Sequence, residues 1–335
     1  MHAVLSAAPR YGPLAAREIR EALPPGAALE DLAPGAWLAS APGRFGDLSA
    51  ALGRAVFVRH LCRADAEVPL PSGEAAEAWV AGPLLRAVAP LLPPTEVQVQ
   101  VDVLPGAPDL RPGPLCALIR EALAGTRARV VGGPAGHALS IVVAAERAYA
   151  GCGPVEANRS PWPGGVARLR ARPGEISRSA RKLEEALELW GIRLPRGGSA
   201  LDLGCAPGGW TGLLLDLGLS VTAVDTARLS PALQGRPALT FLQGSAGSIR
   251  VPAGPFDFLA ADMSWDPLGA AAAACRFRRA LRTDAAGVFT IKFFGGHPLQ
   301  RIAATRAALE AGGFRVGAVR HLYHDRAEAT ALLRA

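Results

Sequence analysis

Lysine is almost absent from this chain. Its 335 residues include 34 arginines but only two lysines, Lys182 and Lys292. A guanidinium group cannot lose its proton in a protein, whereas a lysine amine can when its environment favours the neutral form. The two lysines are therefore candidates for proton chemistry that arginine cannot perform, with survival by chance as the alternative.

Paired cysteines and long apolar runs are also missing. No C-x-x-C pair and no Cys/His cluster with zinc spacing occurs, so we expect a reduced, cytoplasmic protein without a metal. The five cysteines are Cys62, Cys116, Cys152, Cys205 and Cys275. No apolar run is long enough to span a membrane, and the start MHAVLSAAPR lacks the pattern of a signal peptide, so we expect neither feature.

Positive charge is unevenly distributed along the chain. Residues 1–150 contain 13 basic and 14 acidic side chains, whereas residues 151–335 contain 23 basic and 15 acidic ones. The C-terminal part is therefore the candidate surface for a polyanion such as RNA. The alternative is that the excess only favours solubility.

The length predicts two or three domains. Residues 1–60 are expected to form a small α/β domain, because the run HAVLSA precedes a segment with helical spacing, LAAREIREAL. Residues 61–150 are expected to form a second α+β domain. There EVQVQVDVL alternates as a strand does, and LCALIREALAG is typical of an amphipathic helix.

Residues 151–175 differ from both neighbours. Proline and glycine interrupt regular structure there, and one tryptophan, Trp162, stands among the arginines, a combination that can bind phosphate and stack on bases. We expect a basic linker, with RNA contacts at Arg159, Arg168, Arg170 and Arg172. A plain interdomain linker is the alternative.

From residue 176 onward, helical and strand patterns alternate. This order predicts an α/β fold with a doubly wound, mostly parallel, Rossmann-like sheet over residues 176–335. The expected strands are SALDLGC, SVTAVD, LTFLQG, FDFLAADM, GVFTIKFF, FRVGAVRHL and EATALLRA.

The segment ALDLGCAPGGW, residues 200–210, is the sharpest local motif. An apolar strand enters a glycine-rich turn that a helix follows, and the next strand ends at Asp225, where an acid can accept hydrogen bonds from a ribose diol. A dinucleotide fold has a similar outline, but Pro207 stands where that motif needs a free backbone. Asp202 at the strand end can hold a cationic ligand. Both details favour the first motif of S-adenosylmethionine-dependent methyltransferases.

Four ionisable residues are expected to meet beside this loop. Asp262 and Lys292 end two strands of the predicted sheet, and Lys182 lies on the helix before the cofactor strand. Glu328 begins the last strand, so an antiparallel orientation of that strand would bring it to the same edge.

This order of residues resembles the Lys–Asp–Lys–Glu tetrad of the FtsJ-like ribose 2′-O-methyltransferases. The segments SRSARKLEEAL, LDLGCAPGGW and LYHDRAEATALLR, and even ANRSPWPGGVARLR, are similar to the RlmM-like 23S rRNA cytidine 2′-O-methyltransferases of that family. Members of this branch carry an N-terminal THUMP-containing region, which residues 61–150 would supply. The resemblance is strong over residues 150–335, and before that it rests on the order of elements alone.

The resemblance implies a class I S-adenosylmethionine-dependent enzyme, with Lys182, Asp262, Lys292 and Glu328 as catalytic residues. It implies cofactor contacts at Ser179, Ala206, Pro207, Gly208, Gly209, Asp225 and Asp262. The motif adds Asp202, Gly204 and Trp210 to this set. At the position where the family has an acid near the adenine, this chain has Ser245, which can still form a hydrogen bond but without charge.

The expected reaction is methyl transfer to a ribose 2′-hydroxyl, most simply of 23S rRNA, with Lys292 as the base or the group that orients the hydroxyl. RNA is the expected partner, and neither a membrane nor DNA is. Alternatives within the class are a tRNA or an mRNA cap as the acceptor. A catalytically weak rRNA-binding assembly factor is a different class, which the presence of both lysines opposes.

Overall fold

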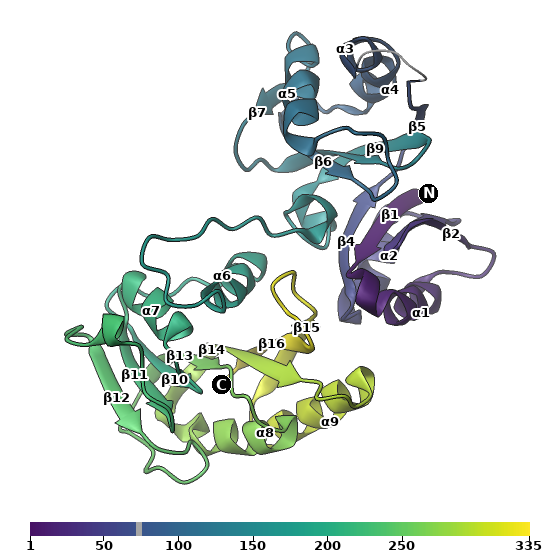
Figure 1. Cartoon of the computed structure of the whole chain (residues 1–335). Helices are drawn as coiled ribbons and strands as arrows, with labels where there is room; N and C mark the ends of the chain where they lie inside the picture. Colours follow the sequence, from purple (N-terminus) through teal and green to yellow (C-terminus); the bar gives the residue numbers. More distant parts are fainter. Residues whose placement is uncertain (72–75) are drawn as a thin grey trace. The chain divides into compact units, whose positions relative to one another are not determined.

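The computed structural model describes residues 1–71 and 76–335, which divide into two compact units, residues 1–166 and residues 167–335. Figure 1 shows both units, coloured along the chain. Among the described residues, no helix combines the length and the apolar character that a membrane span requires.

The first unit contains two sheets, and the first of these is antiparallel throughout. Its strands lie in the order β2 (Ala28–Ala33), β3 (Ala36–Ser40), β1 (His2–Ala7) and β4 (Val58–Arg63). Helices α1 (Gly12–Ala22) and α2 (Phe45–Ala51) belong to the same part of the chain.

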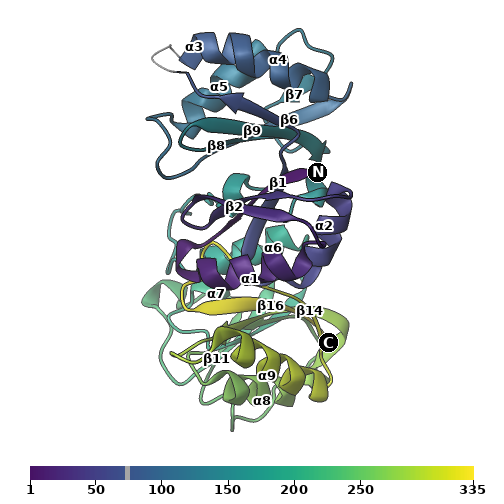
Figure 2. The ribbon, with the colours of Figure 1, turned by 90° about the vertical axis from the view of Figure 1, so that its right-hand side faces the viewer.

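The second sheet is mixed, and Figure 2 shows its helices gathered on one face. Its strands lie in the order β5 (Ala66–Pro69), β9 (Arg147–Pro154), β8 (His137–Val143), β6 (Glu96–Val103) and β7 (Arg129–Val131). The helices are α3 (Ala76–Trp79), α4 (Leu85–Val88) and α5 (Pro112–Ala122). The alternating segment EVQVQVDVL forms β6, and LCALIREALAG forms the main part of α5 and its end, as expected.

The second unit contains a seven-stranded sheet, and every residue from 167 to 335 is described. Its strands lie in the order β12 (Leu239–Gln243), β11 (Ser220–Asp225), β10 (Ser199–Leu203), β13 (Phe256–Ala261), β14 (Leu281–Lys292), β16 (Glu328–Arg334) and β15 (Arg315–Arg320). The first five strands are parallel, and β16 is antiparallel to both of its neighbours. The predicted Rossmann-like sheet and its antiparallel last strand are confirmed.

Four helices cover this sheet, with α6 (Ala180–Leu189) and α7 (Gly209–Asp216) on one face. The other face carries α8 (Pro267–Arg276) and α9 (Pro298–Ala311). Helix α8 was not predicted, because its run of five alanines has a weak apolar pattern. In such a run of alanines the sequence does not distinguish a buried face from an exposed one, and the buried face is set by the sheet and the neighbouring helix.

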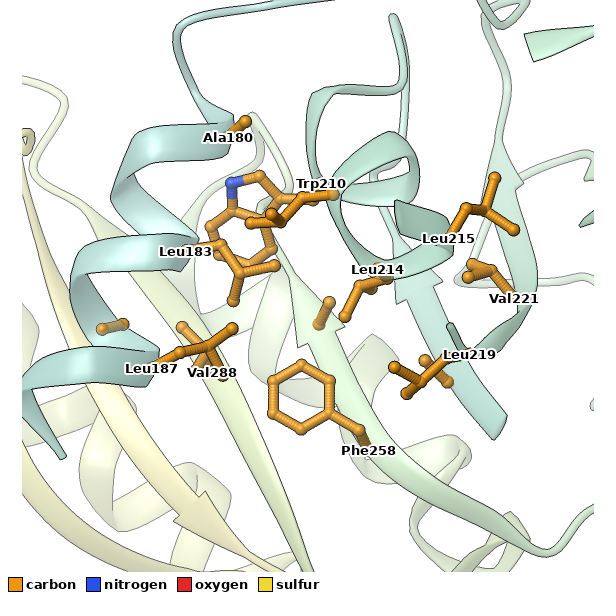
Figure 3. Close-up of a cluster of buried hydrophobic side chains, with 14 of the residues drawn as sticks. Ala180, Leu183, Leu187, Trp210, Leu214, Leu215, Leu219, Val221, Phe258 and Val288 are labelled. Carbon is orange, nitrogen blue, oxygen red and sulfur yellow. The ribbon is translucent and has the colours of Figure 1, made fainter. Parts of the chain in front are cut away.

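The position of α6 depends on its apolar side chains. Ala180, Leu183 and Leu187 recur at helical spacing and are buried against Trp210 and Leu214 of α7, above Phe258 of β13 (Figure 3). Burial of a large aliphatic side chain contributes roughly 1.5–3 kcal/mol. The helix is therefore fixed in rotation, and this rotation turns Lys182 toward the sheet edge.

One sequence expectation fails within the first unit. Arg159 was expected to contact RNA, but its side chain is buried and donates to three backbone carbonyls. Its Nε lies 3.0 Å from the oxygen of Val58, its Nη2 lies 2.7 Å from that of Ala55, and its Nη1 contacts that of Leu52. Arg159 is thus a structural arginine, whereas Arg168 and Arg170 are exposed.

We predict that Arg159→Ala lowers the free energy of unfolding of the first unit by roughly 3 kcal/mol or more, because it leaves buried carbonyls without their charged donor. Urea unfolding followed by tryptophan fluorescence measures this. Arg168→Ala, from the same arginine-rich run but exposed, should change stability by less than roughly 0.5 kcal/mol. Equal stability losses in the two variants would contradict the structural role of Arg159.

Candidate active site

The carboxyl ends of the parallel strands form the edge where the four predicted catalytic residues meet. Lys182 lies in the first turn of α6, and Asp262 directly follows β13. Lys292 is the last residue of β14 and is paired in register with Glu328, the first residue of β16. The antiparallel direction of β16 therefore places Glu328 where the sequence predicted it.

The four side chains form a closed set of ion pairs, in which each lysine contacts both carboxylates. Lys182 Nζ lies 3.1 Å from Asp262 Oδ2 and 2.5 Å from Glu328 Oε1. Lys292 Nζ lies 2.7 Å from Asp262 Oδ1 and also contacts Glu328 Oε2. Two positive and two negative groups thus alternate around one centre.

Burial strengthens these pairs, because a charge removed from water depends on its partners. The Lys182 side chain is 6% exposed and that of Lys292 is 17% exposed, so Lys292 is the lysine more open to a ligand. Burial disfavours the charged form of Lys182, but the carboxylates of Asp262, Asp325 and Glu328 outweigh it and raise its pKa. Lys182 is therefore a fixed ammonium group.

Asp262 is held ionised by the same contacts. Burial raises the pKa of a carboxyl group, but Lys182 and Lys292 outweigh this effect and lower the pKa of Asp262 to about 2. Thr290 contributes as well, since its Oγ1 donates to Asp262 Oδ1 at 2.7 Å. Thr290 was not singled out in the sequence, although its place two residues before Lys292 puts both side chains on the same face of β14.

Two further acids that the sequence analysis did not single out support the cluster. Glu185 lies one turn after Lys182 on α6, is buried, and accepts hydrogen bonds from the backbone nitrogens of Tyr323 (2.7 Å) and His324 (3.0 Å). It also contacts His324 Nδ1 at 2.7 Å. The loop before β16 is thereby fixed to α6.

Asp325 fixes the other side of this loop. Its carboxylate accepts from the backbone nitrogen of Leu322 at 2.9 Å and from Thr330 Oγ1 at 3.0 Å. Burial raises the pKa of Asp325 well above its ordinary value, and Glu328 adds to the increase, although Lys182 opposes it. The segment LYHDRAE had been noted for its resemblance, but no residue before Glu328 was given a role.

A cavity of about 270 Å³ lies beside the ion-pair cluster. Five of the predicted cofactor residues line it, namely Gly204, Ala206, Asp225, Ser245 and Asp262. Trp265 and Thr226 also line it and were not predicted. The cavity and the ion-pair cluster share Asp262, so a ligand in the cavity lies next to the lysines.

Backbone geometry shapes the entrance to this cavity. Gly204 has φ +77°, and a Cβ there would lie 2.8 Å from Met263 Cα, so only glycine fits between the two strand ends. Asp225 then holds the loop in place, because its Oδ2 accepts from the nitrogen of Ala206 at 2.9 Å. Its Oδ1 accepts from the nitrogen of Ala227 at 2.8 Å.

The other predicted cofactor residues support the loop and do not line the cavity, as far as the described residues show. They are Ser179, Asp202, Pro207, Gly208, Gly209 and Trp210. Trp210 Nε1 donates to the carbonyl of Ser179 at 2.8 Å, and the Lys182 ammonium lies 5.9 Å from the centre of its ring. Gly208, with φ +114°, turns the chain into α7.

Asp202 lies in the interior behind the loop. Its side chain is 1% exposed, its Oδ2 accepts from Thr211 Oγ1 at 2.6 Å, and its Oδ1 has no partner among the described residues. Burial raises the pKa of Asp202 to about 7, and the carboxylates of Asp262 and Asp225 add to this shift. A direct contact between Asp202 and a cationic ligand remains a prediction.

Comparison with known proteins gives this arrangement a family. Residues 176–308 match the FtsJ-like methyltransferase family. The chain carries an FtsJ-like methyltransferase domain. The predicted class of S-adenosylmethionine-dependent methyltransferase is thereby confirmed for this domain.

Two curated relatives bear the name ribosomal RNA large subunit methyltransferase M. The protein of Halorhodospira halophila is 39% identical over 189 residues, which are 56% of this chain and 54% of the relative. The protein of Alkalilimnicola ehrlichii is 38% identical over 193 residues, 55% of this chain and 52% of the relative. The chain spans about half the length of the curated relatives it matches.

Two solved structures show lower similarity. A putative hemolysin from Lactococcus lactis has a TM-score of 0.43 and 19% identity, and the match covers 49% of this chain and 89% of that one. Fibrillarin from Aeropyrum pernix, solved with bound S-adenosyl-L-methionine, has a TM-score of 0.37 and 20% identity, with 61% and 85% covered.

The residues around the cavity fit S-adenosylmethionine, the cofactor of the domain. The Asp225 carboxylate suits a ribose diol, and Trp265 offers an aromatic surface to an adenine. Asp262 gives the cavity an anionic wall, which suits a cationic sulfonium group. Ser245 Oγ lines the cavity and accepts from the nitrogen of Gly247 at 3.2 Å, so its hydroxyl hydrogen remains available as a donor.

We predict that Asp202→Asn changes how stability depends on pH. Because folding raises the pKa of Asp202 from 3.8 to about 7, the unchanged protein loses stability as pH rises through this range. The Asp202→Asn variant lacks that loss, so its stability relative to the unchanged protein should increase by roughly 2–4 kcal/mol between pH 4 and pH 8. Urea unfolding at several pH values measures the difference.

Asp216→Asn is the matched control, because the Asp216 side chain is half exposed. It should give a stability curve parallel to that of the unchanged protein. Parallel curves for Asp202→Asn as well would show that the buried carboxyl does not bind the proton.

Proposed function

We propose that this chain transfers a methyl group from S-adenosylmethionine to a ribose 2′-hydroxyl of RNA, and that the acceptor is a cytidine of 23S rRNA. The observation that supports this most is the contact of Lys182 and Lys292 with both Asp262 and Glu328 beside the cofactor cavity. This contact supports the proposal because a lysine amine, which can exchange a proton, pairs with Asp262, and Asp262 also lines the cavity proposed for the cofactor.

S-adenosylmethionine supplies an electrophilic methyl group when it is bound. The protein must hold the hydroxyl in line with it and take up the hydroxyl proton. Lys292 in its neutral form is the candidate for both tasks, because its amine is the more exposed of the two and becomes an ammonium ion when it accepts the proton. Lys182 pairs with the same two carboxylates, so Asp262 and Glu328 retain a cationic partner when Lys292 is neutral.

RNA recognition is proposed to involve several parts of the chain. The names of the curated relatives support rRNA as the substrate. The exposed Arg168 and Arg170 supply positive charge beside the methyltransferase domain, whereas residues 1–150 have almost no net charge. Residues 61–150 are proposed as a THUMP-like RNA-binding domain after a small domain at residues 1–60. Of the predicted linker 151–175, residues 151–166 belong to the first compact unit, so residues 167–175 are proposed as the basic linker to a domain at residues 176–335. The proposed location is the cytoplasm, where rRNA is available.

Mapping of ribose methylation in the 23S rRNA of a deletion strain tests the substrate. We expect one cytidine to lose its methyl group and to regain it when the intact gene is restored. A gene encoding Asp262→Ala serves as the control, because it removes a partner of both lysines. If ribose methylation of 23S rRNA is unchanged and a tRNA loses a methyl group, the substrate is that tRNA. If no RNA loses a methyl group, the result favours a role in RNA binding.

The base is tested with two variants of Lys292. Lys292→Arg keeps the positive charge but cannot accept a proton, and Lys292→Ala removes both properties. We expect both to reduce single-turnover methyl transfer by roughly 100-fold or more while cofactor binding persists. Measurement at several pH values separates loss of the base from loss of positioning.

Arg181→Ala is the matched control for this test, because adjacent residues of a helix point in different directions. Arg181 pairs with Glu175 and does not contact the carboxylates of the cluster, so transfer should remain within a few-fold of normal. Near-normal methyl transfer by Lys292→Arg would contradict the role of Lys292 as the general base and would leave it with an orienting role.

A further inference from the structure

A second cavity, of about 300 Å³, lies between the first turns of α8 and α9. It is lined from the β13 side by Asp266 and Leu268, and from the β14 side by His297, Gln300 and Arg301. The segment after β13 separates it from the cofactor cavity, because residues 262–265 line the first cavity and residues 266–268 line the second. The segment after β13 therefore lines both cavities, and the segment after β14 lines the second.

The chemistry of this second cavity favours a neutral, planar, polar ligand. Its cation is already neutralised, since Arg301 Nη1 lies 3.0 Å from Asp266 Oδ1, so the cavity offers little net charge to a phosphate. The side chains of Gln300 and His297 have no hydrogen-bond partner within residues 1–71 and 76–335. An amide and an imidazole can read the donors and acceptors of a nucleobase edge.

The two segments that line this cavity each carry an exposed apolar side chain, Leu268 in the cavity wall and Phe294 two residues before the lining Gly296. Phe294, two residues after Lys292, is 55% exposed, and Leu268 in the cavity wall is 48% exposed. Phe294 has φ +40°, which is rare and strained for a residue with a large side chain. A strained backbone that holds an aromatic ring in solvent indicates a binding surface, because ring burial in the core would otherwise be favoured.

We propose that Phe294 and the cavity between α8 and α9 bind the nucleobase of the acceptor nucleotide, flipped out of its RNA strand. This rests on the proposed function. A nucleobase suits the volume, which is at the lower end for ligand pockets, and it stacks on aromatic rings in single-stranded RNA. Binding of the base there holds the ribose of the same nucleotide at the edge that carries Lys292.

The first experiment compares Phe294→Ala, Gln300→Ala and Phe294→Tyr with the unchanged full chain, using the RNA that it methylates. We expect Phe294→Ala to raise the KM for RNA by roughly 5- to 100-fold, the range for loss of one base stack, while the cofactor Kd stays unchanged. Gln300→Ala should raise the KM for RNA by roughly 2- to 10-fold, the range for loss of one hydrogen bond, again with an unchanged cofactor Kd. Phe294→Tyr keeps the ring and should stay near normal. Leu217→Ala is the matched control, because Leu217 is an exposed apolar side chain at the end of α7, away from both cavities.

The second experiment removes the base from the RNA instead of the ring from the protein. RNA with an abasic ribose at the acceptor position should bind the unchanged protein roughly 5- to 100-fold more weakly than RNA that carries the base, because one base stack is lost. With the abasic RNA, Phe294→Ala should cause no further loss of affinity. Independent losses from the two changes, a normal KM in Phe294→Ala and Gln300→Ala, or an equally weakened cofactor Kd would overturn the proposal.

The two proposals can fail separately. Active methyl transfer to RNA with no effect of Phe294→Ala or Gln300→Ala overturns the base site alone. If no RNA is methylated, the proposed function fails, and fluorescence anisotropy with labelled base-containing and abasic oligoribonucleotides still tests the site. Equal binding of the two oligoribonucleotides would overturn it.

Discussion

The closed set of ion pairs among Lys182, Lys292, Asp262 and Glu328 is the interaction on which the site depends. Each charge is largely removed from water, so removal of one member leaves each of its two neighbours buried with one partner instead of two, which is costly. The surrounding structure serves this set: the apolar face of α6 fixes Lys182, two parallel strands carry Asp262 and Lys292, and the reversed β16 brings Glu328 into register. The cofactor cavity then shares Asp262, so binding and chemistry use one carboxylate.

The sequence predicted those parts that follow from local pattern and strand direction. The alternation of helices and strands was sufficient for the Rossmann-like sheet, and the scarcity of lysine, together with the strand ends, identified the four charged residues before any contact was known. Parallel strands share an edge, so residues at their ends meet whatever the sequence distance between them. Glu328 depended on the direction of one strand, and that direction was correctly anticipated.

The parts that the sequence missed depend on contacts between distant segments. Arg159 lies in a segment whose composition suggests RNA binding, yet its guanidinium group donates to three backbone carbonyls. The burial of an arginine side chain cannot be predicted from its neighbours in the sequence. Glu185 contacts a loop nearly 140 residues away, and Trp265 reaches the cavity only because β13 ends beside it. Asp202 occupies the expected strand end but is buried behind the loop, where Thr211 is its partner.

The register of β16 has a consequence for the order in which the enzyme matures during synthesis. The glycine-rich loop, Asp225 and Asp262 are made well before Glu328, and Glu185 must wait for Tyr323 and His324. A nascent chain that can already form most of the cofactor cavity thus has two lysines that share a single carboxylate. Non-local pairs of this kind form late because closing a long loop costs entropy. Catalytic competence therefore arises only after Glu328 has been made, when β16 enters the sheet between β14 and β15.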